Sequence, residues 1–159
     1  MYISGIQYES VVDGYGIRNT IFVSGCLHHC KNCHNPQTWD FNYGYEFTED
    51  KQNNFIKKCK ENPLLDGITI SGGDPLYNAI EVLNFIKRYK KNNSTHTIWI
   101  YSGFTIEQIV KNDIMLNLIK ECDVLVDGLF IEELKDMSLP FRGSSNQRII
   151  DIKSYFGIK

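Results

Sequence analysis

Residues 67–75 are Gly67-Ile68-Thr69-Ile70-Ser71-Gly72-Gly73-Asp74-Pro75. The apolar run at the start predicts a short buried strand, and the glycine pair predicts a loop directly after it. From residue 76 onward, apolar residues recur at the spacing of a helix. Asp74 suits the N-cap of that helix, and Pro75 suits its first position. A strand, a glycine loop and a helix in succession open a βαβ unit.

The same succession recurs along the chain. Strands are expected at residues 18–23, 97–101, 123–126 and 147–152. A helix capped by Thr48 should run to about residue 60. Thr105 and Gln108 form a capping box for a further helix that reaches Glu121 with a bend near residues 112–113. Strands that alternate with helices imply a mainly parallel sheet with right-handed crossovers.

The expected fold is α/β, in one domain over residues 1–159. The chain is too short for a complete TIM barrel, which typically needs roughly 250 residues. We therefore expect an incomplete (partial) TIM-like barrel, with a mainly parallel, curved sheet and outer helices. In such folds ligands bind at the carboxyl ends of the strands. The loops that contain Gly72-Gly73, Gly103 and Asp127 should therefore converge on one rim.

Composition narrows the range of functions. Lys and Arg number 17 and Asp and Glu 19, so the net charge of -2 does not favour nucleic acid binding. No apolar stretch is long enough to span a bilayer, and residues 1–5 do not resemble a signal peptide. We expect a soluble, cytoplasmic protein with no membrane partner. Reduced thiols fit that compartment.

Three of the five cysteines follow the predicted strand 18–23, with the spacing Cys26-x3-Cys30-x2-Cys33. Iron–sulfur clusters are held by Cys thiolates, and an ordinary electron carrier uses four of them. Three thiolates would leave one position open, which is typical of a catalytic metal site. Cys59 and Cys122 are remote in sequence and are expected to be buried structural thiols. They lack the spacing of a fourth ligand, which disfavours a plain electron carrier.

Zinc is an alternative occupant of this loop. His28, His29 or His34 could complete a Cys3His site in a zinc-binding interaction protein. Zinc sites usually pair two Cys/His hairpins, and no second hairpin follows here. A disulfide framework is disfavoured by the odd number of cysteines.

Several segments together resemble the radical S-adenosylmethionine superfamily. Within it, the chain resembles the activating proteins of anaerobic ribonucleoside-triphosphate reductases. The cysteine spacing identifies the superfamily, and Arg142-Gly143-Ser144-Ser145-Asn146-Gln147 favours the reductase activators. The other matching segments are Asp13-Gly14-x-Gly16-x-Arg18, Phe22 to Cys26, His29-Cys30, Cys33-His34-Asn35, Ser71 to Leu76 and Val124 to Gly128.

The resemblance implies a function and its cofactors. A 4Fe-4S cluster would bind S-adenosylmethionine (S-adenosyl-L-methionine) at its open iron and cleave it reductively. The radical produced would take a hydrogen atom from one glycine of the anaerobic ribonucleoside-triphosphate reductase. A low-potential electron donor such as flavodoxin or ferredoxin is also implied. A relative that activates another glycyl radical enzyme, such as pyruvate formate-lyase, remains the alternative.

The resemblance also assigns residues. Cys26, Cys30 and Cys33 would hold the cluster, and no catalytic residue is expected beyond the cluster and the cofactor. Six positions are implied as contacts of S-adenosylmethionine: Asn32, Cys33 and His34 beside the adenine, and Gly72, Gly73 and Asp74 near the methionine ammonium. The roles of Ser144, Asn146 and Arg148, on the adenosine side or on the partner surface, stay open.

Two positions depart from the family pattern. Asn32 replaces the aromatic residue that often precedes the third cysteine, so stacking on adenine would come from elsewhere, with His34 as a candidate. Tyr15 replaces a proline in the N-terminal Asp-Gly-Pro-Gly segment. His28 and His29 are expected to be exposed, with tuning of the cluster as the alternative.

Overall fold

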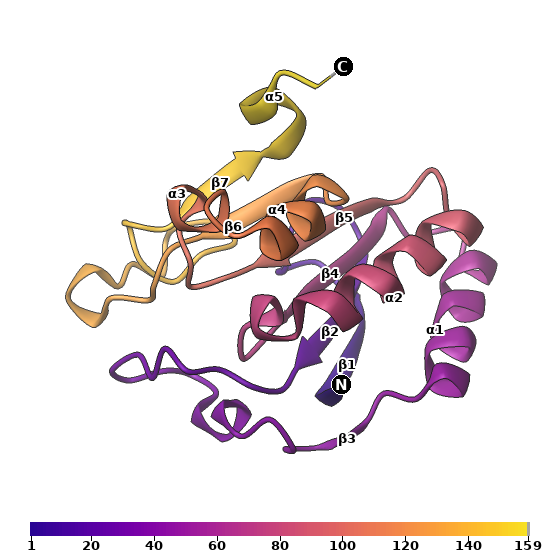
Figure 1. The fold of residues 1–159 in the computed structure, drawn as a ribbon, viewed down its shortest axis with the longest axis horizontal. Helices are drawn as coiled ribbons and strands as arrows, with labels where there is room; N and C mark the ends of the chain where they lie inside the picture. The colour runs from indigo at the N-terminus through magenta and orange to yellow at the C-terminus, as the bar shows by residue number, and fades with distance from the viewer. Residues whose placement is uncertain (159) are drawn as a thin grey trace.

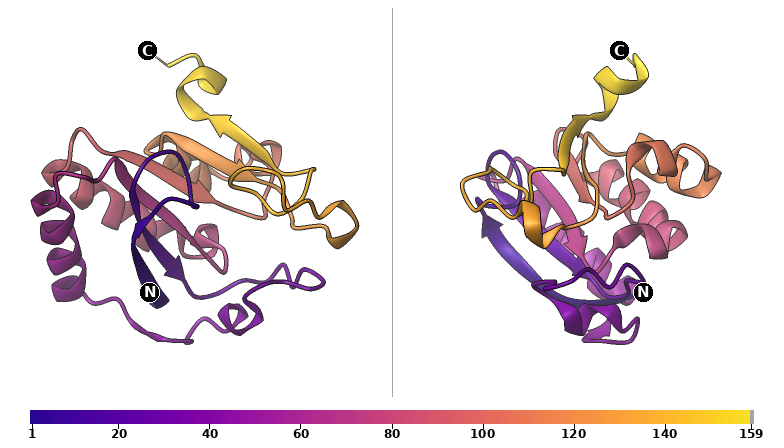
Figure 2. Two further views of the ribbon diagram at one scale, coloured as in Figure 1. Left: turned by 180° about the vertical axis from the view of Figure 1, so that it is seen from behind. Right: turned by 90° about the vertical axis from the view of Figure 1, so that its left-hand side faces the viewer.

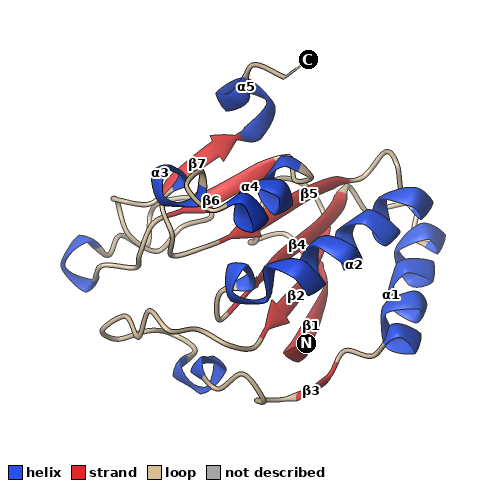
Figure 3. Ribbon diagram, viewed as in Figure 1, coloured by secondary structure: helices blue, strands red, loops and turns tan. Residues whose placement is uncertain are grey.

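The structure is a computed structural model that describes residues 1–158. Within this range one sheet of seven strands has the order β3-β1-β2-β4-β5-β6-β7. The strands are β1 (Tyr2–Ser10), β2 (Arg18–Val23), β3 (Tyr45–Glu46), β4 (Gly67–Gly72), β5 (Thr97–Tyr101), β6 (Val124–Asp127) and β7 (Arg148–Asp151). The helices are α1 (Glu49–Glu61), α2 (Ala79–Asn92), α3 (Ile106–Ile109), α4 (Asp113–Lys120) and α5 (Ile152–Phe156). Figures 1 and 3 show these elements.

The sheet has a parallel centre and antiparallel edges. Strands β2, β4, β5 and β6 are parallel, whereas β1, β3 and β7 pair antiparallel with their neighbours. The predicted α/β class and the mainly parallel sheet are thus confirmed. The sheet is open, with β3 at one edge and β7 at the other, so the likeness to a TIM barrel is not confirmed. No helix within residues 1–158 has the length and apolar character needed to cross a membrane.

Helices α1, α2 and α4 cover one face of the sheet (Figure 1; Figure 2, right). Their apolar side chains form one core with alternate residues of the central strands, such as Ile68, Ile70, Ile98 and Ile100. Burial of apolar surface at this layer is the main source of stability that the sequence provides. The same alternation turns Thr69 and Trp99 to the opposite face, because successive side chains of a strand point to opposite sides.

That opposite face contains a buried arginine. Arg18, at the start of β2, is 1% exposed and donates hydrogen bonds to both Thr69 Oγ1 and Thr97 Oγ1 at 2.9 Å. It also donates to the carbonyl oxygens of Tyr15, Ile68 and Thr97. Burial lowers the pKa of the guanidinium to about 10. Arg18 therefore links β2, β4 and β5. The loop between β1 and β2 (residues 11–17) crosses this face of the sheet (Figure 2, left).

Most predicted element boundaries are confirmed. Thr48 caps α1, and the capping box of Thr105 and Gln108 is present at α3. The expected bend is a break, because the side chain of Asn112 accepts hydrogen bonds from the first turn of α4. Strand β1, in which the pairing with β2 shifts register beside Gly5, was not predicted. The two-residue strand β3 and the short helix α5 were not predicted either.

Candidate metal centre and cofactor cavity

The cysteine loop (residues 24–35) leaves the carboxyl end of β2 and is fixed at its root. Ser24 is fully buried, and its hydroxyl donates to the carbonyl of Tyr43 at 2.7 Å. Gly25 has a φ of +110°, and a Cβ there would lie 2.3 Å from the ring of Phe41. A residue with a side chain would be strained at such a φ and would also displace the ring. The glycine before Cys26 thus lets the loop pass close beneath Phe41.

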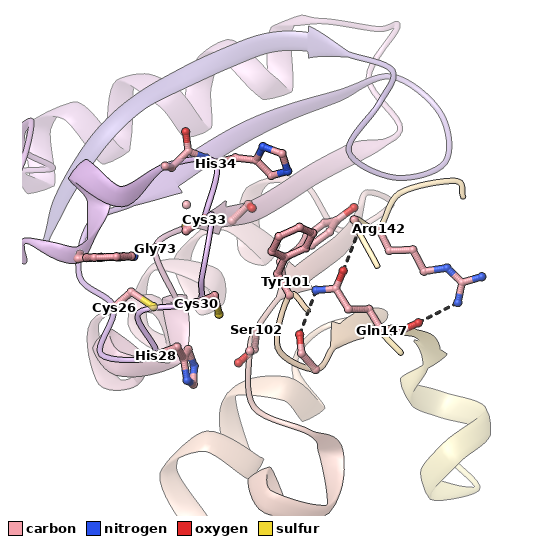
Figure 4. A pocket seen from close by; sticks show the side chains of 18 residues that line it. Cys26, His28, Cys30, Cys33, His34, Gly73, Tyr101, Ser102, Arg142 and Gln147 are labelled. Carbon is pink, nitrogen blue, oxygen red and sulfur yellow. Dashed lines mark hydrogen bonds between the residues drawn. The ribbon is translucent and has the colours of Figure 1, made fainter. Parts of the chain in front are cut away.

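All three cysteines of the loop line one cavity of about 220 Å³. The ends of β4 and β5 contribute residues 71–73 and 101–103 to its wall. The opposite wall comes from the segment 128–147, through Gly128, Phe130, Arg142, Gly143 and Gln147. Figure 4 shows the cysteines on one side of the cavity and Gln147 on the other. The predicted convergence of the loops at the carboxyl ends of the strands is therefore observed.

The thiols of Cys26 and Cys30 lie in an environment that favours their neutral form. Burial raises the pKa of Cys26 to about 11, and a backbone N–H of His28 opposes this effect. Burial also raises the pKa of Cys30. A thiol must lose its proton to bind a metal, so metal binding at these residues would release protons.

Within residues 1–158 no group of three or more His, Cys, Asp or Glu side chains is arranged to hold a single metal ion. A 4Fe-4S cluster does not require the three thiolates to meet at one ion, because each thiolate binds a different iron. Three thiols spaced around one cavity can therefore hold such a cluster. Cys26, Cys30 and Cys33 therefore fit a polynuclear iron–sulfur centre.

Comparison with known proteins agrees with this donor set. The family model described as a 4Fe-4S single cluster domain matches residues 12–150. An anaerobic ribonucleoside-triphosphate reductase-activating protein of Haemophilus influenzae is 41% identical over 149 residues, which cover 91% of this chain and 95% of the relative. The protein of that name from Vibrio cholerae is 39% identical over 142 residues, covering 87% and 90%. That of Escherichia coli K12 is 38% identical over 140 residues, covering 86% and 90%.

The chain belongs to the family of anaerobic ribonucleoside-triphosphate reductase-activating proteins. The resemblance inferred from the sequence is thereby confirmed. Family membership also makes this chain an activating enzyme with a 4Fe-4S domain, and it disfavours the zinc-binding interaction protein.

The glycine pair, Gly72 and Gly73, lies against the start of the cysteine loop. The N–H of Gly73 donates to the carbonyl of Val23 at 2.7 Å, and the N–H of Asp74 donates to that of Gly25 at 2.9 Å. A Cβ on Gly73 would lie 2.7 Å from the carbonyl oxygen of Gly25. The absence of side chains thus allows the end of β4 to touch the root of the loop and still line the cavity.

Substituting Gly72 with alanine should destabilise the fold. Its φ is +113°, and a Cβ would lie 2.4 Å from both the backbone N and O of Val23. Backbone cannot yield as a flexible side chain does, so we expect a loss of at least about 2 kcal/mol in urea unfolding of the metal-free protein. The control is Gly5→Ala, because nothing lies within 4 Å of a Cβ at Gly5. Equal stability of the two variants would contradict the strain assigned to Gly72.

Of the other residues predicted to contact S-adenosylmethionine, only some line the cavity. Cys33 and His34 line the cavity, and the ring of His34 lies 5.4 Å from that of Phe130. Asn32 is exposed, with a φ of +58°, and is not among the residues that line the cavity. Asp74 is fully buried beneath the wall. Its predicted capping role is confirmed, because Oδ1 accepts from the N–H of Leu76 at 2.9 Å.

The two histidines between the cysteines differ. His29 is exposed, as expected, and stacks on Trp39 with ring centroids 4.3 Å apart. The expectation that His28 is exposed was wrong, since 11% of its side chain is accessible. It lines the cavity and contacts Asp74. This contact was not predictable from local sequence patterns, because His28 and Asp74 are far apart along the chain.

The segment 128–147 is held in place by a glutamine that sequence reasoning did not single out. The side chain of Gln147 donates to the carbonyl of Gly128 and accepts from the N–H of Gly143 (Figure 4). It also accepts from the N–H of Ser144. Arg142 donates to the carbonyl of Gln147, and its guanidinium points away from the cysteines (Figure 4). These bonds keep Gly128 and Phe130 against the cavity.

The other polar residues of this region act behind the wall. Ser144 is fully buried and accepts from the N–H of Ile131, and Asn146 donates to the carbonyl of Leu129. Arg148 pairs with Glu107 and Asp127. The loop after Asp127 reaches the rim as expected, but Asp127 itself is not among the residues that line the cavity. Its carboxylate is turned to the N–H of Ile106 at the start of α3, and Gly128 lines the cavity instead.

Proposed function

We propose that this chain uses a 4Fe-4S cluster to cleave S-adenosylmethionine reductively and to generate a glycyl radical on anaerobic ribonucleoside-triphosphate reductase. The observation that carries the proposal is a shared cavity. Three thiols, the glycine pair after β4 and the end of β5 all line it. The names of the relatives support the reductase as the target.

The residues that line the cavity would have separate roles in holding the cluster and S-adenosylmethionine. Cys26, Cys30 and Cys33 would each hold one iron and leave a fourth without a protein ligand. Gly72 and Gly73 would let the methionine part of S-adenosylmethionine approach the backbone closely, while Cys33 and His34 would lie on its adenine side. Phe130 and Tyr101 line the cavity and would limit the access of water to the bound cofactors. When bound, the two cofactors supply an electron and a hydrogen-abstracting radical, and the protein contributes binding, orientation and exclusion of solvent.

The electron donor and the cellular location belong to the same proposal. A low-potential donor such as flavodoxin or ferredoxin follows from the need to reduce the cluster. The five cysteines are free thiols in the structure, which suits the reducing cytoplasm.

Electron paramagnetic resonance tests the choice of partner. The anaerobically reconstituted protein, S-adenosylmethionine and a reductant are incubated either with the reductase or with pyruvate formate-lyase. We expect a glycyl radical signal with the reductase and none with pyruvate formate-lyase. A signal confined to pyruvate formate-lyase would replace the proposal with the alternative activator, and no signal with either partner would contradict radical transfer altogether.

A further inference from the structure

One histidine of the cysteine loop is anchored outside the loop. His28 lies between Cys26 and Cys30, and its Nε2 is 2.6 Å from Oδ2 of Asp74, which is fully buried. A carboxylate oxygen only accepts hydrogen bonds, so Nε2 is the donor of this contact. Hydrogen bonds to a charged group are stronger than those between neutral groups, and burial increases the cost of breaking them.

Asp74 also joins the ends of two strands. Its Oδ2 accepts from the hydroxyl of Ser102 and from the N–H of Gly103, both at 2.9 Å, while Oδ1 caps the turn after β4. One carboxylate thus ties the cysteine loop, the end of β4 and the end of β5 together. Both carboxylate oxygens of Asp74 accept hydrogen bonds from the protein itself, so Asp74 is placed to hold these segments in position.

Two neighbouring aromatic rings also pack against the ring of His28. The ring of Phe104 lies 4.6 Å away at 69°, and that of Tyr77 lies 5.2 Å away at 56°. A Cβ on Gly103 would lie 2.6 Å from Cδ2 of His28 and 2.7 Å from Nε2. Gly103 does not have a left-handed φ, so its lack of a side chain serves the space that the imidazole occupies. The site is therefore shaped for this ring.

We propose that His28 is a positioning residue, whose hydrogen bond to Asp74 holds the cysteine loop in place before any metal binds. The loop is otherwise rich in turns, and His29 and Asn32 have positive φ values. Fixing it from its middle sets Cys26 and Cys30 relative to the glycine pair. The purpose of this pre-organisation rests on the proposed function, whereas the contact itself is a property of the metal-free chain.

Hydrogen exchange in the metal-free protein tests the proposal. His28→Leu removes the donor and keeps an apolar side chain, whereas His28→Gln retains an N–H at a similar reach. Loss of a hydrogen bond to a buried charged group should speed exchange of the amides of residues 26–34 roughly 10- to 100-fold in the leucine variant. The glutamine variant should remain within about threefold of the natural protein, and alkylation of Cys26 should follow the same order.

A matched control distinguishes loss of the His28 hydrogen bond from the loss of any other hydrogen bond to Asp74. Ser102→Ala removes another donor to the same Oδ2, and the hydrogen bonds of this hydroxyl are with Asp74 and the N–H of Phe104 rather than with the cysteine loop. It should leave exchange in residues 26–34 within about threefold. Gly103→Ala, which keeps His28 but intrudes on its ring, should speed exchange there as His28→Leu does.

Two results would overturn the proposal. One is unchanged exchange of residues 26–34 in both His28→Leu and Gly103→Ala. The other is equal acceleration in His28→Leu and His28→Gln, because ring packing and not the hydrogen bond would then hold the loop. Hydrogen exchange and alkylation of Cys26 are both measured without the cluster, S-adenosylmethionine or the reductase. A failed radical assay beside a positive exchange result would therefore overturn the proposed function and leave this inference standing.

Discussion

Replacing Cys26, Cys30 or Cys33 with alanine is expected to abolish formation of 5′-deoxyadenosine from S-adenosylmethionine. Each thiolate would bind a different iron, so the remaining two cannot hold the cube. The loss should exceed about 100-fold, the upper range for removing an outer partner of a metal ligand. Iron and sulfide content after anaerobic reconstitution and a chromatographic assay of 5′-deoxyadenosine measure the two effects together.

Cys59 and Cys122 provide the controls. Cys59 is fully buried and accepts a hydrogen bond from Asn19, and Cys122 is 3% exposed in the core. Neither is among the residues that line the cavity. Alanine at either position should cost some stability but leave the iron content per folded chain unchanged. Full activity in any variant of the cavity cysteines would refute the ligand assignment.

Arg18→Met is expected to cause the largest loss of stability. The change removes the guanidinium, so the buried carbonyl of Ile68 and the part-buried carbonyl of Thr97 lose their donor. Breaking a buried charged network typically costs about 3–5 kcal/mol, a large part of the roughly 5–15 kcal/mol that stabilises an ordinary domain. Arg18→Lys should recover part of this loss, because an ammonium offers fewer donors in a less suitable geometry. Urea unfolding of the metal-free protein measures both variants.

Arg88 is the matched control for Arg18. Its side chain is 32% exposed, and it donates to Gln52 on the surface of α1. Because exposed polar pairs contribute little, Arg88→Met should cost less than about 1 kcal/mol. If Arg18→Met were no more destabilising than Arg88→Met, Arg18 would not hold the central strands together.

The parts of the fold with a clear period were predictable from sequence. The strand, glycine loop and helix at residues 67–92 follow from alternation, the Asp74 cap and helical spacing, and all are present. Strand β1 was missed because Gly5 and the shift in register interrupt its pattern. A strand was expected at residues 147–152, where β7 lies, but strand β3 and the antiparallel pairing of both edge strands were not, because they depend on distant segments rather than on local pattern.

The candidate site was predictable where spacing along the chain carried the information. The three cysteines and the glycine pair were identified in this way, and they line one cavity. The partners of His28 and the supporting bonds of Gln147 were not, because each depends on residues brought together by tertiary structure. Arg18 was placed in a strand, but its burial depends on the threonines that β4 and β5 present to it.

The central claim is that one iron of the cluster has no protein ligand and binds S-adenosylmethionine. Electron–nuclear double resonance on the reduced cluster, with S-adenosylmethionine labelled with ¹⁵N at its amino group, tests this most directly. The account predicts a hyperfine coupling between the cluster and the labelled nitrogen. A reconstituted cluster without that coupling, and with a side chain as its fourth ligand, would contradict it.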